Sequence, residues 1–293
     1  MRVSFLTAVL AASLLGGSAC SSAQSENDTV ADALTNISGK GDDLPEGLKK
    51  AGELEGVHES SGLALAGQPE TFYTFGDDGN PPIIFKVDDT GKLLETIRLP
   101  HAVNHDWESI SRDNKGNYFI ADAGNNNSDR RNLVIYRFRP ENPDQVGPIT
   151  FSYPDQKDFP PKKKERNFDC EATVWHQGKI YLFTKDRGQQ ATSKVYSVPD
   201  RPGTYKADLV TKLAISGEVT DANLSPNGRR LVLMGREEMF ILEGADFQDI
   251  LKNGNKPKRI SLKHAGQTEG VVFTDDNTLY ISTEQGNLYT YKI

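Results

Sequence analysis

The sequence predicts an all-β protein assembled from five copies of one four-stranded unit. An acidic residue followed by small or polar residues and an apolar run recurs along the chain, at separations of 49, 63, 50 and 48 residues. A second and a third β-rich run follow each occurrence. Units of about fifty residues that bury their faces against one another in a circle are typical of a β-propeller. We therefore predict a five-bladed β-propeller, with six blades as the alternative if the 63-residue copy contains a further unit.

Each copy begins with an acidic residue at the start of its first strand. These residues are Glu59, Glu108, Glu171, Asp221 and Glu269. Second strands are expected at 72–75, 118–121, 180–183, 231–234 and 279–282. Third strands are expected at 83–87, 133–136, 194–198, 239–242 and 288–291. These short runs are rich in β-branched and aromatic residues and are bounded by Gly, Asn, Asp and Pro, which is the pattern of antiparallel strands joined by turns.

Fourth strands are weaker and decide how the ring closes. They are expected at 93–99, 149–153, 209–215 and 259–262. The fifth copy reaches Ile293 without a fourth apolar run. Residues 48–54, just before the first copy, are the natural donor of the missing strand. We expect this N-terminal strand to pair with the last copy and close the ring.

The N-terminal residues have the pattern of an export signal. Arg2 precedes an apolar run that is too short for a membrane span, and small residues follow it up to Cys20. The segment around Cys20 resembles the lipobox of bacterial lipoproteins, which implies acylation of Cys20; ordinary cleavage without a lipid is the alternative. We expect a signal peptide at 1–19, a flexible tether at 20–44 and the propeller domain at 45–293. The expected location is the outer membrane or cell surface, otherwise the periplasm or exterior.

Charge and cysteine content exclude several classes of function. The chain carries 34 basic and 41 acidic residues, a formal net charge of -7. A sequence-wide affinity for nucleic acid is therefore excluded, and we expect membrane contact through the N-terminal lipid alone. Two cysteines cannot form a disulfide scaffold or a multi-cysteine metal site. We expect a monomer.

The five acidic residues predict a metal site. Inner strands of a propeller all start at the same channel mouth, so these carboxylates are expected to converge there. Crowded carboxylates raise one another's pKa unless positive charge lies between them. A divalent cation, calcium first, is the simplest such charge, because calcium accepts six to eight oxygen ligands in loose geometry. The alternative is that these acids bind the backbone or hydroxyl groups of neighbouring blades and lock the blades together.

A second set of polar residues is expected at the same mouth, where the second strands end. It comprises Asp77, Asp122, Lys185, Arg236 and Glu284. Arg130, Arg131 and Arg187 lie close to these residues in the sequence. Basic side chains beside a bound cation suit phosphate or carboxylate groups. We therefore predict an anionic ligand, a small molecule or an envelope component, held by Lys185, Arg187, Arg236, Arg130 and Arg131.

Several segments carry a family resemblance. Residues 106–110, 120–126, 168–172 and 182–186 resemble a family of secreted bacterial propellers without an assigned activity. More distantly, 269–270 and 280–284 are similar to SdiA-regulated and esterase-like-phytase propellers. The order of the acids also resembles calcium-dependent apyrases. That resemblance implies that Glu108, Glu171 and Glu269 bind calcium and that Asp77 orients the attacking water. Asp122, from the second set of polar residues, is a further candidate catalytic carboxylate.

These observations leave three functions open. The first is a cell-envelope binding protein that holds a divalent cation and an anionic ligand. The second is a metal-dependent phosphoester hydrolase of the apyrase or phytase type. The third is a scaffold that engages another protein through its rim.

Overall fold

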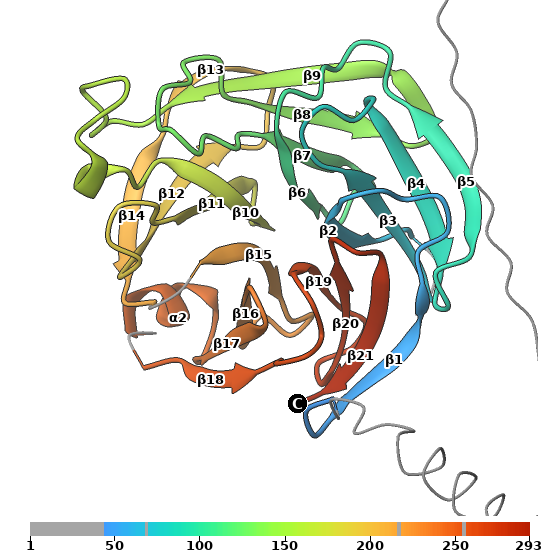
Figure 1. Cartoon of the computed structure of the whole chain (residues 1–293). Coiled ribbons are helices and arrows are strands. Elements are labelled where there is room, and N and C mark those ends of the chain that lie inside the picture. The colour runs from blue at the N-terminus through green and yellow to red at the C-terminus, as the bar shows by residue number, and fades with distance from the viewer. Residues whose placement is uncertain (1–43, 68–69, 216–217, 254–255) are drawn as a thin grey trace, which may run out of the picture. The chain divides into compact units, whose positions relative to one another are not determined.

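The computed structural model shows a five-bladed β-propeller, as the repeat predicts (Figure 1). It describes residues 44–67, 70–215, 218–253 and 256–293. The predicted signal peptide, Cys20 and most of the tether lie outside these residues. The inner strands of the five sheets surround a common centre, and successive blades follow one another around it (Figure 1). None of the described helices is long and apolar enough to cross a membrane.

Four antiparallel strands make up each blade, and their order runs outward from the channel. Blade I contains β2 (Ser60–Leu65), β3 (Thr71–Gly76), β4 (Ile83–Asp88) and β5 (Leu93–Arg98). Blade II contains β6 (Trp107–Arg112), β7 (Tyr118–Asp122), β8 (Val134–Arg139) and β9 (Asn142–Ser152). Blade III contains β10 (Asp169–His176), β11 (Lys179–Lys185), β12 (Ser193–Pro199) and β14 (Asp208–Leu213). Blade IV contains β15 (Val219–Leu224), β16 (Arg230–Gly235), β17 (Glu238–Glu243) and β18 (Lys258–Ser261).

Blade V closes the ring as predicted. It contains β19 (Thr268–Phe273), β20 (Thr278–Thr283), β21 (Asn287–Lys292) and, as its outer strand, β1 (Leu48–Glu53). The N-terminal strand pairs antiparallel with the last strand, from Leu48 opposite Tyr291 to Glu53 opposite Asn287. Because the first and last strands of the described chain share one sheet, their pairing holds the two ends of the described chain together and closes the ring.

Three features depart from the simple repeat. Strand β13 (Gly203–Lys206) pairs parallel with β9 and gives blade II a fifth strand. Helix α2 (Phe247–Asn253) lies between β17 and β18 and buries Phe247 against Tyr181, with ring centroids 4.9 Å apart. The extra length of the 63-residue copy is a connection that contains a short 3-10 helix, Lys163–Glu165, so the six-bladed alternative is wrong.

Apolar side chains between adjacent blades form the core. Between blades I and II, the fully buried Trp107 meets Phe75 edge to face, with ring centroids 5.6 Å apart. The indole Nε1 of Trp107 donates to the Val103 carbonyl at 2.8 Å, so its polar atom is satisfied. A large aromatic residue in this place fills the space between two twisted sheets and excludes water from it.

We expect Trp107→Ala to lower the free energy of unfolding by about 3–5 kcal/mol, because it leaves a cavity between two blades. Chemical denaturation followed by circular dichroism measures the change. Trp175→Ala is the matched control, since Trp175 is half-buried at the channel end of blade III, and it should cost clearly less. Equal losses would show that Trp107 is not a principal contact between the blades.

Candidate metal centre

A β-bulge turns one residue of an inner strand toward the channel mouth in three blades. In blade II, Trp107 pairs with Asp122 and Ser109 with Ala121, so Glu108 is the extra residue between them. Glu171 and Glu269 occupy the same place in blades III and V. Bulges re-aim side chains beside sites in this way. The structure therefore brings three of the five predicted carboxylates to equivalent positions.

The other two predicted acids are placed differently, which corrects the expected ring of five. In blade IV the extra residue is Thr220, and Asp221 follows it. The buried Asp221 accepts hydrogen bonds from Ser109 Oγ at 3.0 Å and from the Val271 backbone nitrogen at 2.9 Å. Asp221 thus connects the inner strand of blade IV to those of blades II and V, as the blade-locking alternative expects of an acid bonded to hydroxyl and backbone groups. Glu59 precedes β2, is exposed and binds Asn80 Nδ2 at 2.9 Å.

Two carboxylates that the repeat did not single out complete the mouth. Asp106 and Asp169 lie two residues before Glu108 and Glu171. Asp77, Asp106 and Glu108 form one group, each contributing an oxygen that lies within 4.8 Å of the others. Glu108, Asp169 and Glu171 form a second group by the same measure. The available sequence signal was the Asp-x-Glu spacing, which occurs at the start of both strands.

Space for the first group depends on Gly124, which follows β7. A Cβ at this residue would clash with the carboxylates of Asp106 and Glu108. Arg130 holds the same loop by donating to the Gly124 carbonyl at 2.6 Å and to Asp122 Oδ1 at 2.8 Å. The glycine therefore serves the site through close approach rather than through a positive φ angle.

Two basic residues neutralise the second group. Lys185 Nζ lies 3.1 Å from Glu171 Oε2. Arg187 Nη2 lies 2.7 Å from Glu171 Oε1, and its Nε lies 2.5 Å from Asp169 Oδ2. Burial opposes ionisation of Glu171, but the charges of Lys185 and Arg187 outweigh it and lower the pKa of Glu171. Glu171 is thus the ionised centre of the mouth.

The remaining carboxylates resist ionisation. Burial and the charge of Glu171 raise the pKa of Glu108 and of Asp169 well above their ordinary values. Burial, reinforced by neighbouring carboxylates, raises the pKa of Asp77 and of Glu269 to about 7 and that of Asp106 to about 6. Positive charge among these groups would lower their pKa values, because it favours the ionised forms.

Asp77 shows the clearest sign of an unmet interaction. Its Oδ1 is buried and has no hydrogen-bond partner within the described part of the chain. Buried carboxylate oxygens are ordinarily bonded, and an exception points to an ion, a water or a ligand. Asp122, by contrast, is fully satisfied: it binds His105 Nδ1 at 2.9 Å, Arg130, and the Asp106 backbone nitrogen at 3.1 Å.

Of the other predicted basic residues, Arg131 and Arg236 lie apart from the carboxylate groups, whereas Arg130 lies beside the first group. Arg131 stacks over the ring of Phe159, at 3.7 Å from the ring centroid. Arg236 is exposed and lines a surface hollow together with Arg259 and Lys263. Arg130 is bound by Asp122 and the Gly124 loop, and its Nη1 lies 3.9 Å from Asp106 Oδ2. Of the five predicted anion ligands, Lys185, Arg187 and Arg130 are those that the structure brings to the carboxylate groups.

Without a cation, we expect the free energy of unfolding to fall as the pH rises from about 4 to about 7. The folded protein holds protons on Asp77, Asp106 and Glu269 more tightly than the unfolded chain does, so this stabilisation is complete below pH 4 and is lost through the raised pKa values. Melting in excess chelator across this range measures the trend. The variant Asp77→Asn with Glu269→Gln should flatten it, and an unchanged slope would contradict the assignment.

Comparison with known proteins identifies the family. A search of curated proteins finds no match. Among solved structures, a PQQ-bound aldose sugar dehydrogenase from Streptomyces coelicolor is similar over 85% of this chain and 99% of its own, at 13% identity and a TM-score of 0.48. A gluconolactonase from Xanthomonas campestris is similar over 84% of this chain and 89% of its own, at 10% identity and a TM-score of 0.49. The model of the SdiA-regulated family matches residues 47–292, and the chain belongs to the SdiA-regulated family.

Proposed function

We propose that the carboxylate-lined mouth binds a divalent cation, and that an anionic ligand completes the coordination of this cation. The observation that carries the proposal is the convergence of Asp77, Asp106 and Glu108, whose oxygens lie within 4.8 Å of one another. These residues come from blades I and II, which are separate sheets. Oxygens gathered from separate sheets are costly to hold together as bare charges, and a cation between them removes that cost.

The first carboxylate group is the better cation site of the two. Asp169 and Glu171 already share Arg187, and Glu171 also binds Lys185. Asp77 has an unpartnered oxygen, and neither Asp77 nor Glu108 forms an ion pair with a basic side chain of the described residues. In the first group Asp106 alone has a basic neighbour among the described residues, Arg130 at 3.9 Å, so a cation there would meet two carboxylates that lack a counter-charge.

The chemistry of the ligands favours calcium. Every candidate ligand atom in the two groups is a carboxylate oxygen, and neither group contains histidine or cysteine. Oxygen ligands suit hard cations, whereas zinc prefers nitrogen and sulfur. Calcium tolerates the irregular geometry of side chains drawn from separate strands, while magnesium requires near-octahedral order. Outside the cytosol, where the N-terminal pattern predicts this protein to reside, modules with calcium dissociation constants of about 0.1–1 mM are effective sites.

Arg187 is the basic residue best placed to reach an anionic ligand. Its side chain is 25% exposed, whereas that of Lys185 is 5% exposed. An anion bound to the cation could share Arg187 with Asp169 and Glu171. Lys185 then has a supporting role, since it keeps Glu171 ionised beside the cation.

We expect calcium to raise the melting temperature of the full chain and Glu108→Gln to weaken calcium binding at least about tenfold. At about 100 times the dissociation constant, calcium should add about 2.7 kcal/mol to the free energy of unfolding. Calorimetric titration after chelator treatment measures the affinity. Glu95→Gln, on the exposed outer strand β5, is the matched control and should bind calcium like the parent. An unchanged melting temperature at millimolar calcium would refute the cation site.

A phosphoester hydrolase is the second candidate, and the unpartnered Oδ1 of Asp77 favours it. A carboxylate beside a bound cation can orient a water for attack on a phosphoryl group that the cation polarises. The test is phosphate release from nucleoside triphosphates and from phytate with calcium. Under the hydrolase proposal, the parent releases phosphate and Asp77→Asn loses most of the activity while still binding calcium. Calcium binding without phosphate release from any of these compounds would leave a binding protein.

A further inference from the structure

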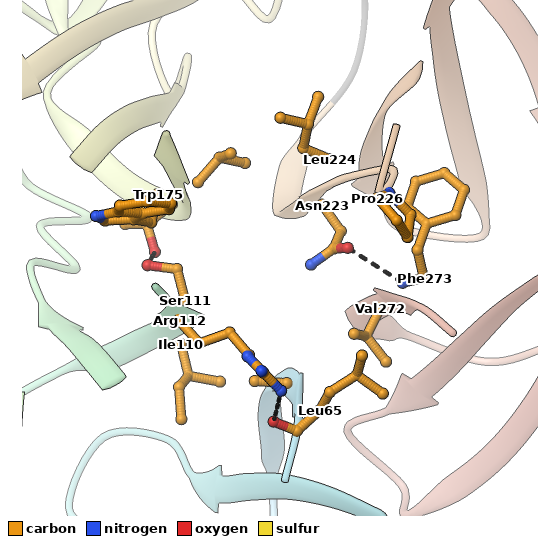
Figure 2. A pocket seen from close by; sticks show the side chains of 13 residues that line it. Leu65, Ile110, Ser111, Arg112, Trp175, Asn223, Leu224, Pro226, Val272 and Phe273 are labelled. Carbon is orange, nitrogen blue, oxygen red and sulfur yellow. Dashed lines mark hydrogen bonds between the residues drawn. The ribbon is translucent and has the colours of Figure 1, made fainter. Parts of the chain in front are cut away.

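A second cavity lies at the opposite end of the channel. It has a volume of about 150 Å³, and residues near the C-terminal ends of all five inner strands line it (Figure 2). Leu65 ends β2, Arg112 ends β6, and Phe273 ends β19. The carboxylates of the metal centre lie at the starts of inner strands or, for Asp77, at the end of β3 beside the start of β2, so the two sites occupy different mouths.

Hydrogen-bonded side chains separate the two mouths. Ser109 Oγ donates to Asp221 Oδ1 at 3.0 Å and lies 3.1 Å from Thr173 Oγ1. Thr173 Oγ1 in turn donates to Ser111 Oγ at 3.2 Å. Thr173 and Ser111 line the second cavity, whereas Asp221 and Ser109 lie deeper in the channel. A ligand in this cavity therefore meets the hydroxyl groups and not the carboxylate groups of the metal centre.

The charge of the cavity is opposite to that of the chain. Its lining contains one charged residue, Arg112, and no carboxylate. Arg112 Nη1 donates to the Leu65 carbonyl at 3.2 Å, and no acidic side chain of the described residues lies within ion-pair distance of the guanidinium (Figure 2). An arginine that lacks a protein carboxylate keeps donors available for an anion.

A second donor faces the cavity from blade IV. Asn223 Oδ1 accepts from the Phe273 backbone nitrogen at 3.1 Å, which fixes the amide so that Nδ2 points into the cavity (Figure 2). Apolar side chains face the cavity from several blades. Trp175 directs its Nε1 away, to Asp200 Oδ2 at 2.9 Å, so the indole presents hydrocarbon to the cavity, as do Leu65 and Val272.

We propose that this cavity binds a small carboxylate that carries a six-membered ring. A protein cavity of about 150 Å³ holds a benzene ring. The ring fills the space between Trp175, Leu65 and Val272, and the carboxylate accepts hydrogen bonds from Arg112 and Asn223. The site is independent of the metal centre, because none of its residues belongs to the carboxylate groups.

Sodium benzoate is the probe, titrated to about 10 mM into the full chain, since ligands of this size bind in the micromolar to millimolar range. Calorimetry measures affinity, and tryptophan fluorescence reports contact with Trp175. We expect saturable binding, at least about tenfold weaker binding of the neutral analogue benzyl alcohol, and the same benzoate affinity in calcium and in chelator. No binding, equal affinity for the alcohol, or a requirement for calcium would overturn the proposal; the last would place the anion at the metal centre.

Two variants test the named contacts. Arg112→Gln keeps a donor for the Leu65 carbonyl but removes the charge, and it should weaken benzoate binding at least about tenfold. Asn223→Asp keeps the acceptor for Phe273 and places a negative charge in the cavity, and it should abolish binding. Arg98→Gln, an exposed arginine of β5, is the control and should bind like the parent. Melting curves establish folding. Folded variants with parental affinity for benzoate would refute the assignment.

Discussion

Closure of the ring is the constraint on which the rest of the structure depends. The pairing of β1 with β21 joins residues that are far apart in the sequence and gives each blade two neighbours. A closed ring sets the angle between successive blades, so the starts of the inner strands meet at one mouth. The approach of Asp77 to Glu108 within 4.8 Å follows from that angle rather than from any local contact in either blade. The geometry of such a site therefore persists only while the ring is closed.

The buried carboxylates at the mouth lower the stability of the folded protein. Burial and mutual repulsion raise the pKa of Glu108 and Asp169, while Lys185 and Arg187 lower that of Glu171. An interior made for stability alone would replace this cluster with apolar residues, because buried charges rarely repay their desolvation. Carboxylates with strongly shifted pKa values are concentrated at functional sites. The raised pKa of Asp77 and its unpartnered oxygen have the same cause: no positive group of the described residues compensates this carboxylate.

The repeat predicted the blades but only part of the site. Strand positions follow from alternation and turn residues, which are local signals, so the five blades and the closing strand could be predicted. Which acid faces the mouth depends on the position of a β-bulge, and the bulge leaves no clear signal in the sequence. Glu108 is the bulged residue of its strand, whereas Asp221 stands one residue beyond the bulge of β15 and turns into the channel. Helix α2 and strand β13 lie in connections, where the repeat carries no information.

The two ends of the channel differ in whether a basic side chain is free to bind an external anion. At the carboxylate mouth, Lys185 and Arg187 form ion pairs with Glu171 and Asp169, so their positive charge stabilises the protein's own carboxylates. An arginine placed there could bind an external anion only in competition with these neighbours. At the opposite mouth, Arg112 donates to a backbone carbonyl and forms no ion pair with a carboxylate of the described residues. Because no carboxylate lines the cavity to offset Coulomb attraction to an incoming anion, one arginine can determine selectivity there.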